Sequence, residues 1–130
     1  MKFRAYIVED SPTIRKNLAE ALRELADVEP VGGAETEQEG QRWLAEHADG
    51  WDLAIVDLFL REGSGFNVLE ACKWRPPSQK MVVLSNHATR EVRWRCAALG
   101  ADAVFDKSTE IDDLVEYCLK QRAQLAGTVH

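Results

Sequence analysis

The sequence has few cysteines and no long run of apolar residues. Its three cysteines are odd in number and lie more than 20 residues apart, at Cys72, Cys96 and Cys118. That spacing argues against a disulfide framework or a local metal knuckle, so we expect reduced thiols in the core. No apolar stretch approaches the length of a membrane span, and the acids in the opening "MKFRAYIVED" do not fit a signal peptide. These absences predict a cytoplasmic protein with no membrane partner.

The sequence also has fewer basic residues than acidic ones. The chain has 16 Lys and Arg against 22 Asp and Glu, a formal net charge of −6, and no long basic run. This balance argues against direct binding to nucleic acid. The chain also lacks repeats, low-complexity tracts and linkers, and 130 residues with 45% hydrophobic content suit one globular domain. We place that domain at residues 1–125 and a short C-terminal tail at 126–130.

Short apolar runs alternate along the chain with amphipathic segments. The runs are "FRAYIV", "VEPVGGA", "DLAIV", "KMVVL" and "ADAVF", and they are typical of parallel strands buried on both faces. Between the first two runs, Ser11 can cap a helix that has Pro12 in its first position. Further helices are expected at roughly 36–48, 65–75, 88–99 and 110–124.

The first and last predicted helices each have one apolar side. Helical spacing assigns five residues to that side in each case, namely Ile14, Leu18, Ala21, Leu22 and Leu25, and Ile111, Leu114, Val115, Cys118 and Leu119. The resulting (βα)5 order predicts an α/β fold. Parallel strands need crossover connections, so we expect a doubly wound, five-stranded, flavodoxin-like parallel sheet with helices on both faces.

In such a sheet, ligands bind beyond the carboxyl ends of the strands. The residues that follow the apolar runs include three acids, a hydroxyl and an ammonium group, namely Glu9, Asp10, Asp57, Ser85 and Lys107. Each has an ordinary explanation when taken singly, as a solvated strand end, a helix cap or an exposed charge. Together, three carboxylates at one edge would repel each other unless a cation held them. Mg²⁺ binds carboxylates and phosphate oxygens, and a phosphate would also attract the lysine and accept a hydrogen bond from the serine. The set therefore predicts a site for phosphoryl transfer.

Four motifs carry a specific resemblance. "VEDSP", "LAIVDLFL", "VVLSNHA" and "GADAVFDKS" stand in the order and at the strand ends typical of one family. The chain thus resembles a receiver domain of the two-component response regulators over essentially its whole length. The resemblance implies that a histidine kinase or phosphotransfer protein donates a phosphoryl group to Asp57. It also implies that the chain promotes only its own phosphorylation and dephosphorylation and is not otherwise an enzyme.

The same resemblance assigns roles to the residues around the phosphoacceptor. Asp10 would bind Mg²⁺ directly, Glu9 would bind it through water, and the backbone carbonyl of Phe59 would supply another ligand. Lys107 would stabilise the charge on the phosphoryl group, and Ser85 would hydrogen-bond it. Phosphorylation would then move the Ser85 loop and change an interaction surface.

That predicted switch and partner surface lies on the fourth helix, the fifth strand and the fifth helix, where a downstream effector would bind. Its residues are Ser85, Val104, Phe105, Arg90, Trp94 and Tyr117. Val104 stands where the family usually has an aromatic ring, and Phe105 follows it. Ser108 replaces a common proline, so a cis peptide bond after Lys107 is not expected. Phe59 and His87 occupy positions that would flank the phosphoryl group.

Among the tryptophans, Trp43, Trp51 and Trp74 are interpreted as packing residues, whereas Trp94 lies opposite the apolar side of its helix and is expected to be exposed. Three other functions compete with the switch. A receiver-like module that works without phosphorylation remains the alternative. A phosphatase of the haloacid-dehalogenase type needs an acid where Phe59 stands, and the acids of "EDSPT" would repel a flavin phosphate.

Overall fold

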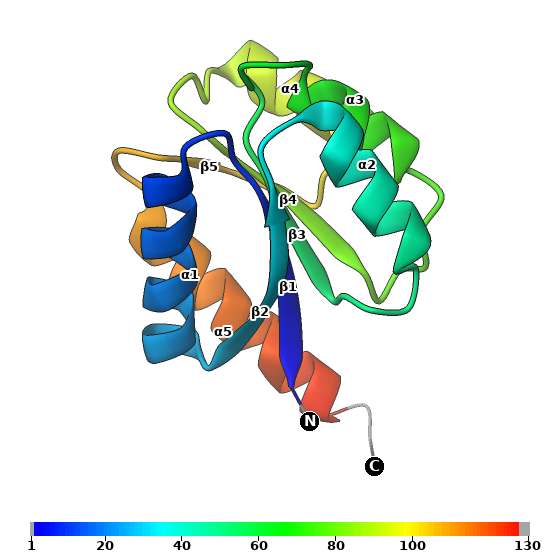
Figure 1. Cartoon of the computed structure of the whole chain (residues 1–130). Helices are drawn as coiled ribbons and strands as arrows, with labels where there is room; N and C mark the ends of the chain where they lie inside the picture. Colours follow the sequence, from blue (N-terminus) through cyan, green and yellow to red (C-terminus); the bar gives the residue numbers. More distant parts are fainter. Residues whose placement is uncertain (1, 128–130) are drawn as a thin grey trace.

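The computed structural model describes residues 2–127, with side chains through residue 125. Strands and helices alternate along the chain in five pairs (Figure 1). Their bounds are β1 Phe3–Val8, α1 Pro12–Ala26, β2 Val28–Ala34, α2 Glu37–Glu46, β3 Leu53–Val56, α3 Gly65–Ala71, β4 Lys80–Ser85, α4 Arg90–Ala98, β5 Ala103–Asp106 and α5 Ile111–Gly127. All five predicted strands are confirmed. The last helix continues beyond the predicted end of the domain at residue 125, and residues 128–130 of the predicted tail lie outside the described residues.

The five strands form one parallel sheet in the order β2-β1-β3-β4-β5. Strand β3 lies at the centre, and all four of its residues are buried. The last residues of β1 and β3, Val8 and Val56, are register partners, as are Ser85 of β4 and Asp106 of β5. This register matters for function because it brings the residues that follow these strands to one edge of the sheet.

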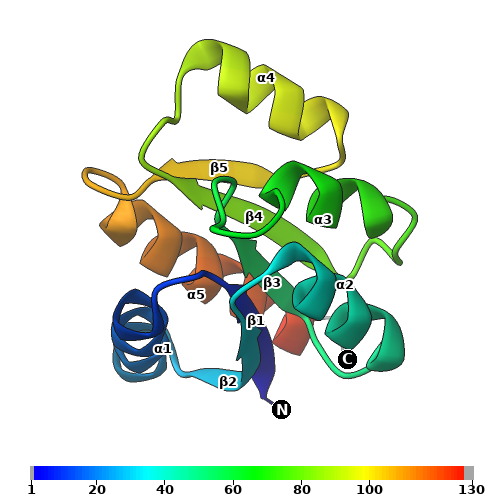
Figure 2. The same cartoon turned by 45° about the horizontal axis from the view of Figure 1, so that its top comes forward.

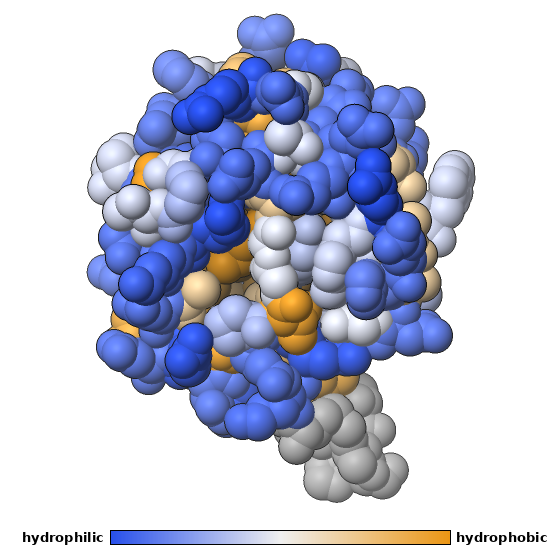
Figure 3. All heavy atoms as spheres, in the orientation of Figure 1, coloured by the Kyte–Doolittle hydropathy of each residue, from blue (hydrophilic) through white to orange (hydrophobic). Residues whose placement is uncertain are grey.

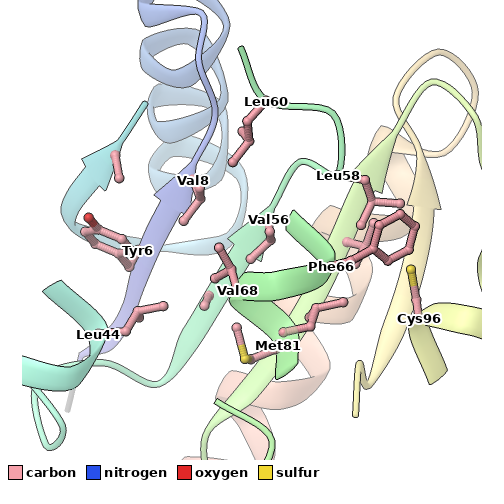
Figure 4. Packing of buried hydrophobic residues seen from close by; sticks show 14 of the residues in the cluster. Tyr6, Val8, Leu44, Val56, Leu58, Leu60, Phe66, Val68, Met81 and Cys96 are labelled. Carbon is pink, nitrogen blue, oxygen red and sulfur yellow. The ribbon is translucent and has the colours of Figure 1, made fainter. Parts of the chain in front are cut away.

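The helices cover both faces of the sheet (Figure 2). Helices α1 and α5 pack on one face, against a core that includes Phe3, Leu22 and Ile55. Helices α2, α3 and α4 pack on the other face, where Figure 4 shows side chains from both the sheet and these helices meeting around Val56 and Val68. The predicted doubly wound α/β fold is therefore confirmed.

Side-chain caps explain where the helices begin. The Ser11 hydroxyl accepts a hydrogen bond from the Ile14 amide at 3.3 Å, and Pro12 occupies the first turn as predicted. Thr36, Ser64 and Thr89 cap α2, α3 and α4 in the same way. These caps stabilise the helix starts that immediately follow the loops at the carboxyl edge of the sheet.

Three of the residues assigned to the apolar helix sides are exposed. The exposed fractions of Ile14, Leu25 and Leu119 are 44%, 59% and 43%. In α1 the buried residues are Leu18, Leu22 and Ala26, which are four apart. Leu25 is offset from that stripe by one residue, and Ile14 lies in the first turn, at the end of the stripe. The predicted apolar sides were therefore too wide.

The structure agrees with the predictions for three of the four tryptophans. Trp43 stacks on the rings of Tyr6 and His47, with centroids 4.0 and 4.2 Å apart, and Trp51 is buried. The interpretation of Trp74 as a packing residue is wrong, because its side chain is 91% exposed. Helix α3 ends at Ala71 rather than at residue 75, so Trp74 lies in the turn that follows and not on a helix face. Trp94 is 73% exposed, as predicted.

The cysteines are free thiols. Cys96 and Cys118 are buried and Cys72 is half-buried. Burial raises the pKa of all three thiols, that of Cys118 to about 12. None of the peptide bonds among residues 2–127 is cis, in agreement with the expectation from Ser108.

The described helices include none with the length and apolar character needed to span a membrane. The face of the molecule seen in Figure 3 is mostly hydrophilic, and apolar residues appear on it only in small patches.

Candidate functional site

The loops after β1 and β3 bring three carboxylates together. Carboxylate oxygens of Glu9, Asp10 and Asp57 lie within 4.8 Å of one another. Glu9 is 3% exposed and Asp57 is 8% exposed, while Asp10 is half-buried. The Asp57 amide donates to the Val8 carbonyl at 2.9 Å, which fixes the end of β3 beside the end of β1. We call these three residues the acidic cluster.

Lys107 joins the acidic cluster from β5. Its Nζ lies 2.9 Å from Asp57 Oδ2 and 2.5 Å from Glu9 Oε1. The Lys107 amide donates to the Ser85 carbonyl at 3.0 Å, so the backbone after β5 is held against the end of β4. The lysine side chain is 14% exposed and thus mostly shielded from water. Lys107 itself therefore supplies a cation between two of the three acids.

Burial and contacts shift the charges of this group. The pKa of Glu9 is raised above its ordinary value, mainly because the carboxyl is buried, although the hydrogen bond from Lys107 acts in the opposite direction. Burial opposes the charge on Lys107, but the contacts with Glu9 and Asp57 outweigh it and raise the pKa of this lysine. Lys107 therefore stays charged at neutral pH.

Asp10 is the most accessible member of the acidic cluster. Its Oδ2 accepts a hydrogen bond from the Arg61 amide at 2.8 Å. The pKa of Asp10 is lowered, first by its interaction with the Glu9 carboxyl and also by the Arg61 amide. An ionised and partly exposed carboxylate beside two buried ones leaves a side of the cluster open to a ligand.

The loop after Asp57 depends on a glycine. An added Cβ at Gly65 would lie 2.2 Å from the Asp57 carbonyl oxygen, so any larger residue would push α3 away from the acid. The Gly65 amide donates to the Leu58 carbonyl at 2.9 Å. Gly65 was not among the predicted site residues, although the glycines that follow Asp57 in "LREGSG" are the signal for such a close approach.

Ser85 is fully buried at the end of β4. Its hydroxyl accepts a hydrogen bond from the His87 amide at 3.0 Å, and no other hydrogen bond to this hydroxyl is found within residues 2–127. The structure thus places Ser85 at the same sheet edge as Asp57 and Lys107, with its hydroxyl proton available to a further acceptor.

Two aromatic rings connect the loop after Asp57 with the loop after Ser85. The Phe59 amide faces Asp57 Oδ1 at 3.4 Å, and the Phe59 ring contacts the His87 ring edge-on with centroids 5.4 Å apart. Phe59 is 53% exposed, so the pair lies at the surface beside the acidic cluster. The positions predicted to flank a phosphoryl group are therefore in contact with each other.

Two members of the predicted switch and partner surface, Ser85 and Phe105, are buried and do not lie at the surface. Arg90 and Trp94 are exposed on α4, and Tyr117 is half-buried on α5. Phe105 is buried and contacts the Tyr117 ring with centroids 5.7 Å apart, whereas Val104 packs into the core on the opposite face of the sheet. Figure 2 shows α4 and α5 on either side of β5.

Arg93, which was not among the predicted site residues, connects the elements of this region. Arg93 donates to the carbonyls of Ala88 and Val104 at 3.0 and 2.8 Å, and it forms an ion pair with Glu110 at 2.5 Å. The loop after Ser85, strand β5 and the start of α5 are thus linked by one side chain. A basic residue within a helix carries no sequence signal for such a role.

Comparison with known proteins identifies the family of this chain. The model of the response regulator receiver domain matches residues 5–118. The chain belongs to this family, and the resemblance inferred from its motifs is confirmed. It is a receiver domain of the two-component response regulators.

Individual relatives agree with this assignment. The chain is 29% identical over 110 residues to the Bacillus subtilis transcriptional regulatory protein YhcZ, covering 85% of this chain and 50% of that protein. It is 28% identical to a probable chemotaxis protein CheY of Rhizobium etli, with 87% of each covered. A crystal structure of a Burkholderia pseudomallei response regulator with a phosphorylated aspartic acid, calcium ion and citrate superposes with a TM-score of 0.76 at 17% identity. That match covers 98% of this chain and 72% of the other.

The chain is shorter than several of these relatives. It spans 50% and 59% of the two curated regulators that it matches first, YhcZ and the Rhodobacter capsulatus photosynthetic apparatus regulator RegA. The match therefore concerns their receiver portion.

Proposed function

We propose that Asp57 is the phosphoacceptor of a signalling switch and that a phosphohistidine donates the phosphoryl group. The observation that carries this proposal is the position of Asp57, whose carboxylate lies among two further acids and 2.9 Å from Lys107 at the carboxyl edge of the sheet. A buried carboxylate surrounded by acids and one lysine is costly for stability alone. It is well suited to transfer of a phosphoryl group.

The proposed reaction is an in-line displacement. An Asp57 carboxylate oxygen attacks phosphorus, the P–N bond to the donor imidazole breaks, and the electron pair of that bond stays on the imidazole nitrogen. The transition state spreads negative charge over three phosphoryl oxygens. Lys107 is held at the acceptor carboxylate and provides positive charge where it develops. Later attack by water returns Asp57 to its free form and releases phosphate.

The acidic cluster has the donor set of a Mg²⁺ site. Its carboxylate oxygens converge within 4.8 Å, and hard oxygen donors are the ligands that Mg²⁺ prefers. We propose that Asp10, Asp57 and the Phe59 backbone carbonyl bind the ion directly and that Glu9 acts through water. The ion would offset repulsion between the acids and draw the phosphoryl oxygens into place.

Ser85 and its loop connect the site to an output surface. The Ser85 hydroxyl would donate to the new phosphoryl group, and the loop that follows leads directly to α4. We propose that the surface of α4, β5 and α5, with Arg90, Trp94 and Tyr117, binds a downstream effector protein or domain. Val104 and Phe105 belong to β5, two and one residues before its end at Asp106, and Lys107 follows that strand. A histidine kinase or phosphotransfer protein in the cytoplasm would be the donor.

The proposal is tested by measuring intact mass after incubation with Mg²⁺ and acetyl phosphate. We expect the addition of one phosphoryl group to the wild-type chain, labile to hydroxylamine as an acyl phosphate is. Asp57→Asn should abolish the addition because the nucleophile is lost. Asp52→Asn is the control, since Asp52 lies at the other end of β3, where it pairs with Arg4.

Labelling that survived in Asp57→Asn would move the acceptor to another residue and refute the assignment. Failure of the wild-type chain to accept a phosphoryl group from either acetyl phosphate or a phosphorylated kinase would favour the alternative, a receiver-fold interaction module that works without phosphorylation.

A further inference from the structure

A groove and an exposed tryptophan lie side by side at the opposite edge of the sheet. The groove has a volume of about 540 Å³ and runs between the C-terminal half of α2 and the end of α3. Its lining includes Leu44, Trp51, Ala71 and Cys72, and Trp74 stands at its rim. We call it the α2–α3 groove. Trp74 is 91% exposed, the largest exposed fraction among the large hydrophobic residues that the structure describes.

The α2–α3 groove is remote from the acidic cluster. Trp51 precedes β3, which begins at Leu53, and Gln79 precedes β4, which begins at Lys80. The groove thus lies at the amino ends of the central strands, whereas Asp57 and Ser85 lie at their carboxyl ends. No residue of the acidic cluster lines it.

The turn that presents Trp74 is held rigidly. Arg75 donates to the carbonyls of Cys72, Gln79 and Gly100 at 3.1, 2.7 and 2.8 Å, and it forms an ion pair with Asp102 at 2.7 Å. An indole on a fixed turn loses little conformational freedom on binding, which favours its use as an anchor.

Both the Trp74 indole and the apolar lining of the groove face water within a single chain. An exposed indole beside an apolar groove is unfavourable in water, because both surfaces remain hydrated.

Charges of opposite sign lie in the groove and beside the exposed indole. Asp49 lines the groove on the side of α2. Lys73 lies outside the groove, with its ammonium 5.7 Å from the centroid of the Trp74 ring. A two-fold rotation can therefore bring the indole and the base of one copy to the recess and the acid of another.

We propose that the occupant of the α2–α3 groove is the Trp74 side chain of a second copy of this chain. In the two-fold dimer, each Trp74 enters the groove of the other copy, and Lys73 of each copy faces Asp49 of the other. A tryptophan buries about 150–250 Å², so two of them supply only part of the roughly 1,600 Å² of a standard stable interface. The dimer is therefore weak and forms at high protein concentration.

Sedimentation equilibrium over protein concentrations from low micromolar to millimolar tests the proposal. The weight-average mass of the wild-type chain should rise toward twice the chain mass, whereas Trp74→Ala should stay monomeric throughout. Trp94→Ala is the matched control, because Trp94 is also exposed but lies on α4. It should dimerise like the wild type, and so should Asp57→Asn, because the groove does not include the phosphoacceptor.

Variants that exchange the charges of Lys73 and Asp49 test the dimer while Trp74 stays unchanged. Lys73→Glu should weaken the dimer, and Lys73→Glu combined with Asp49→Lys should restore it. A wild-type chain that stays monomeric at every concentration would overturn the proposal. So would a dimer that persists in Trp74→Ala or is lost in Trp94→Ala. These outcomes do not depend on phosphoryl transfer to Asp57, so the two proposals fail independently.

Discussion

At the scale of single residues, Lys107 serves both the stability of the fold and the proposed chemistry. It pairs with Glu9 and Asp57, both nearly buried, and so compensates charges that would otherwise be costly to desolvate. The proposed chemistry requires the same ammonium group at the phosphoryl group. Stability in the resting state and transfer chemistry therefore depend on one side chain, and its removal should affect both.

Replacing Lys107 with methionine keeps the length of the side chain and removes its charge. We expect Lys107→Met to lower the free energy of unfolding by about 3 kcal/mol, because it leaves two buried carboxylates without the cation that pairs with them. Adding Asp57→Asn to Lys107→Met should recover part of this loss, since one stranded charge disappears. Urea denaturation at neutral pH of the wild type, both single variants and the double variant measures the coupling.

Lys120→Met is the control for this experiment, because Lys120 is an exposed lysine on α5. It should change stability little. If the effects of Lys107→Met and Asp57→Asn on the free energy of unfolding are additive in the double variant, the ion pair at 2.9 Å between the two residues contributes nothing to stability.

The sequence predicted which residues meet, but not how they pair. Glu9, Asp57, Ser85 and Lys107 could be placed at one edge because each follows a strand of a parallel sheet. The direct contact of Lys107 with Glu9 depends on side-chain conformation and burial, which strand order does not specify. Trp74 was misplaced for a related reason, since helical spacing does not show that α3 ends before it.

At the scale of secondary-structure elements, Arg93 links three segments that a switch would have to move. Its contacts reach Ala88 before α4, Val104 in β5 and Glu110 before α5. The Glu110 carboxylate also accepts from the Asp106 amide at 2.9 Å. The family's usual ring is replaced here by Val104, and the guanidinium group provides a polar connection across the same region.

Arg93→Met should lower the melting temperature by several degrees, because two carbonyl groups and one carboxylate each lose a hydrogen bond from the guanidinium group. The pKa of Glu110 is held below its ordinary value, first by Arg93. A depressed carboxyl pKa means that the stabilisation is present at neutral pH and is lost as the pH falls through the folded-state pKa. The difference between wild type and Arg93→Met should therefore narrow in acid.

Thermal melts at neutral and acidic pH measure this effect, with Arg90→Met as the control. Arg90 is an exposed arginine in the first turn of the same helix. Equal melting temperatures for the Arg93→Met and Arg90→Met variants at neutral pH would show that Arg93 does not tie these elements together.

The strands were easier to predict than the helix limits. Strands β1, β3 and β4 are short apolar runs buried almost throughout by helices on both faces, so their composition alone marks them. The edge strands β2 and β5 are only partly buried. Helices are half-exposed, and their buried stripes depend on how they lie on the sheet. This explains why Ile14 and Leu25 were assigned to the core although α1 buries only the stripe through Leu18 and Leu22.

For the whole molecule, the acidic cluster should couple metal binding to stability. An ion that binds only the folded chain stabilises it by about 1.4 kcal/mol when present at ten times its dissociation constant. For a domain of this size, that gain raises the melting temperature by about 5 °C. Mg²⁺ should therefore raise the melting temperature of the wild-type chain above its value in EDTA at matched ionic strength.

Single substitutions show whether the rise in melting temperature with Mg²⁺ comes from the acidic cluster. Asp10→Asn and Asp57→Asn should each gain less from Mg²⁺ than the wild type, because each loses a charged oxygen donor from the acidic cluster. Asp112→Asn removes the same charge from an exposed position in the first turn of α5 and should keep the full gain. Equal gains in all three variants would mean that the ion acts as a general salt. Loss of the gain in Asp10→Asn and Asp57→Asn alone would instead tie the stability of the whole fold to the three carboxylates at its carboxyl edge.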